Sequence, residues 1–180
     1  MLSKNKIKFI NSLKIKKYRD IHGLFIAEGV KTFDDLILGG MKPVFIAAGP
    51  DFFAAHLLPE SIEKLEISRS ELLQISSQVT PSDVLALFEI PVFKTDFIEA
   101  TSELTLFLDN VQNPGNLGTI IRTAEWFGIR NIFCSRETAD IYNPKVVQAT
   151  MGGIARIHVM YVDSEEFFTE IGKRKKVKVY

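Results

Sequence analysis

The segment between residues 104 and 129 constrains the fold of this 180-residue chain more than any other. Residues 104–108 are dense enough in apolar side chains for a buried parallel strand. Residues 109–118 then contain two glycines, one proline and three asparagines, which is typical of a loop. Open α/β sheets place their ligands at polar loops of this kind, beyond the carboxyl ends of strands. The segment therefore predicts a strand, a ligand-facing loop and a helix.

The amphipathic stretch that follows the loop predicts a helix with one arginine on its polar side. Asn116 is the expected N-cap, and Gly128 is expected to end the helix in a left-handed conformation. At 100° per residue, Arg122 points away from the apolar face, on the flank shared with Gly118, while Trp126 lies on the far side. The apolar face itself is expected to consist of Leu117, Ile120, Ile121, Ala124 and Phe127.

Apolar runs and helical periodicities alternate along the rest of the chain, which predicts an α/β fold with a parallel sheet in its C-terminal part. The polar stretch 94–102 has no apolar periodicity and is the expected linker between an N-terminal domain, 1–93, and a C-terminal domain, 103–180. Strands are expected at 24–27, 43–48, 84–88, 131–135, 154–161 and 177–180. Helices are expected from Ile7 through Arg19 to a stop at Gly23, at 30–38, at 69–75 after an N-cap at Ser68, at 145–150 after Asn143-Pro144, and from Asp163 to Gly172.

Composition limits the class of protein. The single cysteine, Cys134, excludes an internal disulfide, and the chain has neither an apolar run long enough for a membrane span nor a signal-peptide core, so a soluble cytoplasmic protein is expected. The net charge of zero is unevenly distributed. Residues 1–20 hold seven basic side chains and one acidic one, and residues 173–180 hold five basic and no acidic ones. Basic ends around an acidic body indicate a local contact with a polyanion, although lysines can equally serve to solvate a terminal helix.

The loop and helix match a known signature closely. The pattern D-N-x-x-[DN]-P-x-N-x-G-x-I-x-R-x-A-x-x-F-G resembles the first motif of the SpoU-type (TrmH-like) RNA 2′-O-ribose methyltransferases, a knotted family of the SPOUT class. The glycine pattern fits neither a dinucleotide-binding fingerprint nor a P-loop, which disfavours a dinucleotide-binding domain. The matching residues are Asp109, Asn110, Asn113, Pro114, Asn116, Gly118, Ile120, Arg122, Ala124, Phe127 and Gly128.

Weaker matches in the expected order support the resemblance. Lys17-Tyr18-Arg19 with the segment 25–29, FIAEG, is similar to the opening of the family's ribosomal-protein-like substrate-binding domain, and the segment 77–87 is similar to its end. The segment 140–159 carries the small-Met-Gly-small sequence around Met151, although many relatives have proline where His158 stands. The family's two later signatures, which supply most contacts to S-adenosylmethionine, do not occur in this sequence. We therefore expect this chain to be inactive alone, with its cofactor-binding residues unknown.

The resemblance implies a function and assigns roles to residues. It implies S-adenosylmethionine-dependent methylation of ribose 2′-hydroxyls in structured ribosomal or transfer RNA, by a homodimer that contacts its partner through the methyltransferase domain. Arg122 and Asn116 are the expected catalytic residues, and Lys17, Arg19 and Glu28 are the expected RNA contacts. Arg122 could instead form a surface ion pair with Glu125, and Glu28 could be a buried polar anchor. The histidines show no metal-site or triad pattern, so no metal is expected. The alternative function is an RNA-binding module without catalysis.

Overall fold

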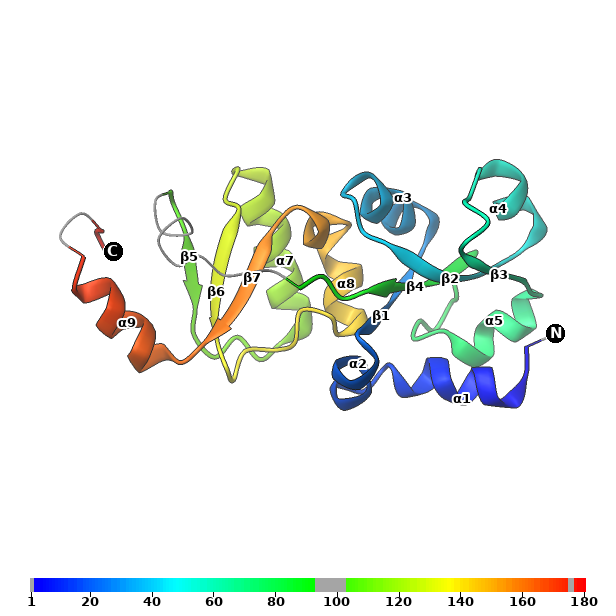
Figure 1. The fold of residues 1–180 in the computed structure, drawn as a ribbon, viewed down its shortest axis with the longest axis horizontal. Helices are drawn as coiled ribbons and strands as arrows, with labels where there is room; N and C mark the ends of the chain where they lie inside the picture. Colours follow the sequence, from blue (N-terminus) through cyan, green and yellow to red (C-terminus); the bar gives the residue numbers. More distant parts are fainter. Residues whose placement is uncertain (1, 93–102, 175–176) are drawn as a thin grey trace.

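A computed structural model describes residues 2–92, 103–174 and 177–180. Its two sheets lie side by side along the long axis of the molecule (Figure 1). The N-terminal part contains α1 (Lys4–Ser12), α2 (Lys16–His22), β1 (Leu24–Glu28), α3 (Val30–Leu38), β2 (Pro43–Ala48), α4 (Pro50–Ala55), β3 (Glu63–Glu66), α5 (Arg69–Ile75) and β4 (Val84–Glu89). The C-terminal part contains β5 (Leu106–Leu108), α7 (Pro114–Trp126), β6 (Asn131–Ser135), α8 (Pro144–Thr150), the 3-10 helix η1 (Gly153–Ala155), β7 (His158–Val162) and α9 (Ser164–Gly172).

The N-terminal sheet has the strand order β1-β4-β2-β3 and is covered on both faces. Strand β4 pairs antiparallel with β1 and β2, while β2 and β3 are parallel. Side chains alternate between the faces, as the pleat requires. Phe25 and Ala27 pack towards α3 and α4, whereas Ile26 between them packs towards α1 and α5.

The C-terminal sheet is parallel, in the order β5-β6-β7, as the sequence predicts. Helices α7 and α8 cover one face, where Ile132 and Cys134 are fully buried. Helix α9 covers the other face, with the ring of Phe167 at 4.7 Å from both Phe107 and Phe133. After β7, helix α9 therefore crosses back towards β5 on the face opposite α7 and α8.

Most predicted elements are confirmed, and the errors have physical causes. The single helix expected from Ile7 to Arg19 is wrong, because the chain breaks into α1 and α2 where the carbonyl of Leu13 accepts a hydrogen bond from the Arg19 side chain. The strand expected to start at Ile154 begins at His158, because Gly152 adopts φ +86 and a 3-10 turn follows it. Helix α4 and strand β3 were not predicted, and residues 177–180 form no strand. The predicted linker, residues 94–102, lies wholly outside the described residues.

A capping box ties the start of α5 to the N-terminus. The Ser68 side chain accepts from the Glu71 backbone, and the Glu71 carboxylate accepts from the backbone N–H groups of Ser68 and Leu2. Those donors lower the pKa of Glu71 from 4.5 to about 2.

Glu71→Gln is therefore expected to weaken the fold in a pH-dependent way. A carboxylate with a lowered pKa stabilises the fold above its unfolded-state pKa, and that contribution is lost as the pH falls through the folded-state value. The stability difference between Glu71→Gln and the parent should be full at neutral pH and should shrink between about pH 4.5 and pH 2. Urea unfolding across that range measures it, with the exposed Glu60→Gln as control. A difference that stays constant with pH would contradict the expectation.

Candidate active site at the start of helix α7

The loop between β5 and α7 forms one side of the candidate site. Helix α7 begins at Pro114, and its N-cap is Asn113, whose side chain accepts from the backbone N–H of Asn116 at 3.1 Å. The prediction that Asn116 caps the helix is therefore wrong by three positions. Proline favours the first helical position, where its missing N–H costs nothing, so the residue before it becomes the cap. Asn116 itself lies exposed in the first turn, where its amide is free to face a ligand.

Hydroxyl groups from the end of β6 hold this loop in place. Asn110 has the unusual φ of +53, and its backbone N–H donates to Ser135 Oγ at 2.9 Å. The next N–H, of Val111, donates to Thr138 Oγ1 at 3.3 Å, and that hydroxyl donates to the carbonyl of Leu108. The loops after β5 and β6 are thereby joined into one unit beside the carboxyl ends of the strands.

Arg122 is exposed on α7 and contacts the turn after α8. Its Nη1 lies 2.9 Å from Met151 Sδ, and Met151 ends α8 in a left-handed conformation with φ +50. The alternative ion pair with Glu125 is not formed, because Glu125 accepts from Arg156 Nε at 2.8 Å instead. A thioether is only a weak acceptor. Within the described part of the chain, the Arg122 charge is thus positioned without being neutralised.

The contact between Arg122 and Met151 depends on how closely α7 and α8 approach. A Cβ atom built on Gly118 would lie 2.4 Å from the Cβ of Ala149 and 2.9 Å from the carbonyl oxygen of Val146. Only glycine fits this crossing without displacing a neighbour. Gly118, the signature glycine within α7, therefore sets the distance between the two helices.

The three expected RNA contacts have different surroundings. Lys17 is exposed on α2 and has no side-chain partner among the described residues, so its predicted RNA contact stays a prediction. Arg19 is only 1% exposed, and its guanidinium is bonded to Asp140 and to the Leu13 carbonyl. Glu28 is also buried, and it accepts hydrogen bonds from the residues at 76 and 77. This burial does not agree with RNA contacts at Arg19 and Glu28, and both are interior anchors of the fold.

Sequence reasoning missed two partners of the predicted site residues. Met151 was noted only as part of a matching segment, although it is the residue that contacts Arg122. Asp140, which the sequence pattern does not link to any other residue, binds Arg19 across the junction of the two sheets. The lone Cys134 is fully buried, and burial raises its pKa to about 12, so it is not a nucleophile.

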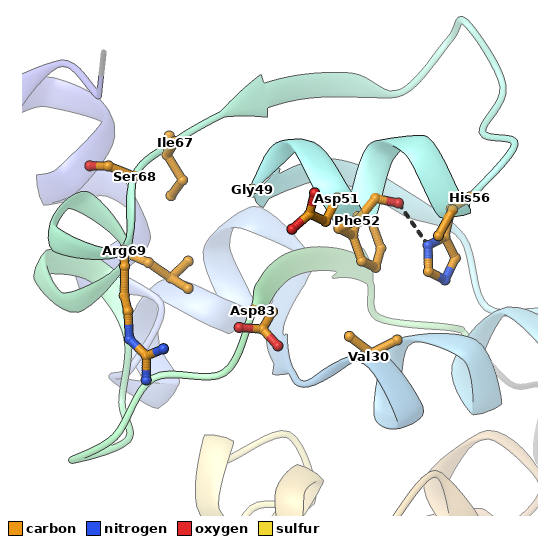
Figure 2. Close-up of a pocket in the computed structure, with 11 residues that line it drawn as sticks. Val30, Gly49, Asp51, Phe52, His56, Ile67, Ser68, Arg69 and Asp83 are labelled. Atoms are coloured by element: carbon orange, nitrogen blue, oxygen red, sulfur yellow. Dashed lines mark hydrogen bonds between the residues drawn. The ribbon is translucent and has the colours of Figure 1, made fainter.

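Two hollows in the surface lie away from Arg122. One, of about 650 Å³, lies at the junction of the sheets between α2, the end of β4, the loop after β6 and β7, and its lining includes Lys16, Arg136 and Asp140. The other, of about 400 Å³, lies where α3, α4 and α5 begin, and Asp51, Arg69 and Asp83 surround it (Figure 2). Neither is lined by Arg122 or Asn116.

Comparison with known proteins agrees with this architecture. The SpoU rRNA Methylase family model matches residues 103–180, and the MRM3-like substrate binding domain model matches residues 4–86. A solved structure of a TrmH-family protein from Porphyromonas gingivalis is 37% identical, with a TM-score of 0.84, covering 96% of this chain and 69% of that one. The chain belongs to the SpoU/TrmH family of RNA methyltransferases. An AdoMet-bound rRNA methyltransferase from Sinorhizobium meliloti, 31% identical, superposes on this family member with a TM-score of 0.80, covering 94% of this chain and 66% of that one.

The names of two curated relatives of this SpoU/TrmH protein describe methyltransferases of ribosomal RNA. The Bacillus subtilis 23S rRNA (guanosine(2553)-2′-O)-methyltransferase RlmP is 28% identical over 177 residues, covering 97% of this chain and 68% of that protein. The Xenopus laevis mitochondrial rRNA methyltransferase 3 is 27% identical over 161 residues, covering 85% of this chain. The chain spans only 38% of the length of that mitochondrial relative.

The residues of this SpoU/TrmH chain fit the methyl donor only in part. A small-molecule site normally encloses most of its ligand's surface. Beyond the end of β5, the side chains of Asp109, Asn110 and Gln112 are exposed, so these residues do not enclose a ligand. No group of His, Cys, Asp or Glu suited to a metal ion occurs among the described residues. In the same part of the chain, no helix is long and apolar enough to cross a membrane.

Proposed function

We propose that this chain forms the RNA-facing part of an S-adenosylmethionine-dependent 2′-O-ribose methyltransferase that acts on structured RNA, with ribosomal RNA as the first candidate. The observation that carries the proposal is the exposed, uncompensated Arg122 on α7, whose guanidinium contacts Met151 at the turn after α8. The names of the relatives support ribosomal RNA over transfer RNA.

Arg122 supplies positive charge where the reaction develops negative charge. A ribose hydroxyl is a weak nucleophile, and its oxygen must lose a proton and lie in line with the methyl group. When bound, S-adenosylmethionine supplies that methyl group on a sulfonium centre. The arginine side chain stays protonated in proteins and is a poor base, so the hydroxyl proton leaves to solvent, while Arg122 stabilises the developing alkoxide and holds the adjacent phosphate. The exposed Asn116 amide, in the first turn of the same helix, is placed to orient the ribose.

Exposed lysines near the N-terminus supply the affinity for RNA. Lys4, Lys8 and Lys17 are exposed and have no side-chain partner within the described ranges, whereas Lys6 binds Glu63 and Lys16 binds Asp20. Free lysines release counterions when they meet phosphates, which favours binding without regard to sequence. This arrangement suits a domain that grips structured RNA while α7 faces the target ribose.

One assay tests both whether the protein methylates ribosomal RNA and whether residues 1–180 alone suffice for that reaction. The protein as its gene encodes it, called the full-length protein below, is incubated with ³H-methyl-labelled S-adenosylmethionine and ribosomal RNA from cells that lack the gene. Labelled dinucleotides that resist alkali are the expected product, since a 2′-O-methyl group blocks cleavage. Residues 1–180 alone are expected to bind RNA without transferring label, because the exposed residues beyond β5 do not enclose a methyl donor. RNA binding without transfer by the full-length protein would instead favour a binding module.

We also propose that the protein is a homodimer through the C-terminal end of α7. Trp126 and Phe127 are 83% and 75% exposed at adjacent positions, so Phe127 does not join the core as predicted. Two large exposed aromatic side chains together are unfavourable in a monomer.

Trp126→Glu combined with Phe127→Glu is expected to convert a dimer into a monomer. A carboxylate at each position would have to be desolvated in the interface, which opposes association. Sedimentation equilibrium of the full-length protein measures the mass. Leu38→Glu, at an 84% exposed position on α3, is the control and should stay dimeric. Equal masses for all variants would show that the C-terminal end of α7 does not form the dimer interface.

A further inference from the structure

A buried ion pair joins the N-terminal part of the protein to the C-terminal sheet. Arg19 Nε lies 3.0 Å from Asp140 Oδ2, Nη2 binds the same oxygen, and Nη1 donates to the Leu13 carbonyl at 2.9 Å. The pair connects positions 121 residues apart. The side chains are 2% and 14% exposed, so solvent and salt screen them little.

Asp140 belongs to a loop, residues 136–142, that is held from two sides. Its second carboxylate oxygen accepts from the backbone N–H of Tyr142, and the Tyr142 ring packs on Phe25 of β1 with 4.9 Å between centroids. On the other side, the Tyr161 hydroxyl donates to the Ala139 carbonyl and accepts from the N–H of residue 141. The position of the loop is therefore defined by β1 and α2 as well as by its own sheet.

The same loop determines the position of the signature loop before α7. The backbone N–H of Ala139 donates to the Val111 carbonyl at 2.9 Å, and the Thr138 hydroxyl accepts from the Val111 N–H. Two residues further on, Asn113 caps the helix that carries Arg122. Hydrogen bonds and two short backbone stretches, 139–140 and 111–113, thus connect Arg19 through Asp140 and the two loops to the start of α7.

We propose that Arg19 and Asp140 are positioning residues that fix the signature loop and α7 relative to the RNA-gripping N-terminal part. This deepens the proposed function, because it explains how RNA held by one part meets Arg122 of the other. A buried ion pair is often no more stable than well-packed apolar side chains of similar volume. The directional bonds of the guanidinium, to Asp140 on one side and Leu13 on the other, instead specify one orientation of the two parts.

The first test separates positioning from RNA contact. The logarithm of the RNA-binding constant falls linearly with the logarithm of the salt concentration. Each phosphate contact that is lost makes this negative slope shallower by about 1. Binding of ribosomal RNA by the full-length double variant Arg19→Met/Asp140→Leu should show the same slope as the parent. Binding by Lys17→Met should show a shallower slope. A shallower slope in the double variant would overturn the proposal, because it would show that Arg19 contacts RNA phosphate.

The second test separates positioning from stability. Arg19→Met alone leaves a buried carboxylate unpaired and is expected to unfold more easily, whereas the double variant fills the space with apolar atoms. The double variant should regain the parent's melting temperature while its turnover stays about tenfold to a hundredfold lower, since small misplacements cost rates of that order. Turnover that recovers together with melting temperature would show a purely structural pair.

A third measurement does not depend on activity or on the apolar variant. Asp140→Asn keeps the shape of the side chain but removes its charge. Hydrogen exchange should become faster at the backbone amides of Val111 and Ala139 and stay unchanged in α5, which does not touch the junction. Unchanged exchange at both amides would overturn the proposal. If the parent transfers no methyl group, the proposed function fails, and this exchange experiment alone decides the role of the pair.

Discussion

Arg122→Ala in the full-length protein is expected to lower turnover about 10²- to 10³-fold, the usual effect of removing one group that stabilises charge in a transition state. RNA affinity should change little, because the lysines near the N-terminus provide most of the phosphate contacts. Arg122→Lys should fall between the parent and the alanine variant. It keeps the charge but loses the planar fork that can hold a phosphate and the hydroxyl oxygen together.

The neighbouring ion pair supplies the control for Arg122. Arg156 binds Glu125, one turn along α7 from Arg122, with side-chain exposures of 41% and 28%, so its removal takes away a nearby charge without removing Arg122. Exposed pairs of this kind contribute about 0–1 kcal/mol to stability. Arg156→Ala should therefore keep nearly full turnover. Single-turnover rates and filter-binding constants for the three variants check the prediction, and unchanged turnover in Arg122→Ala would remove the assigned role.

Local signals predicted elements well wherever they were strong. Pro43–Ala48, Val30–Leu38 and Asn131–Ser135 appear at the predicted bounds because each is a short apolar or periodic run between turn residues. Strand β3 was missed because Glu63–Glu66 carries three exposed charged side chains, and its pairing with β2 is decided by tertiary contacts.

Site residues could be predicted only where their role is local. Arg122 lies outward on α7 because helical spacing dictates it. The partners of Arg19 and Glu28 could not be inferred, since Asp140 lies 121 positions away from Arg19, and the residues that bind Glu28 follow α5. The sequence pattern therefore favoured a ligand contact for Arg19, which a long-range pair buries, whereas for Glu28 it left a buried polar anchor open, and the burial agrees with that alternative. The N-cap was misplaced for a different reason, because two asparagines three positions apart both suited it and the intervening Pro114 decided between them.

The second large effect is expected from Gly118→Ala, at the crossing of α7 and α8. An added Cβ would lie 2.4 Å from the Cβ of Ala149 and 2.9 Å from the Val146 carbonyl, and a backbone oxygen cannot rotate away. Overpacking of this kind costs about 1–3 kcal/mol, and the better helix propensity of alanine returns up to about 1 kcal/mol of it. We expect a net loss of stability, together with lower turnover, because α8 must move and take Met151 away from Arg122.

Two further variants make the Gly118 prediction specific. Gly172→Ala adds the same methyl group at the end of α9, where nothing lies within 4 Å, so it should be neutral or slightly stabilising. Gly118→Ala combined with Ala149→Gly removes the side-chain clash but keeps the close approach to the Val146 carbonyl, so it should recover part of the lost stability. Urea unfolding gives the free energies for all three. Full stability of Gly118→Ala alone would mean that the helices can separate at no cost, and the distance between Arg122 and Met151 would then not depend on this glycine.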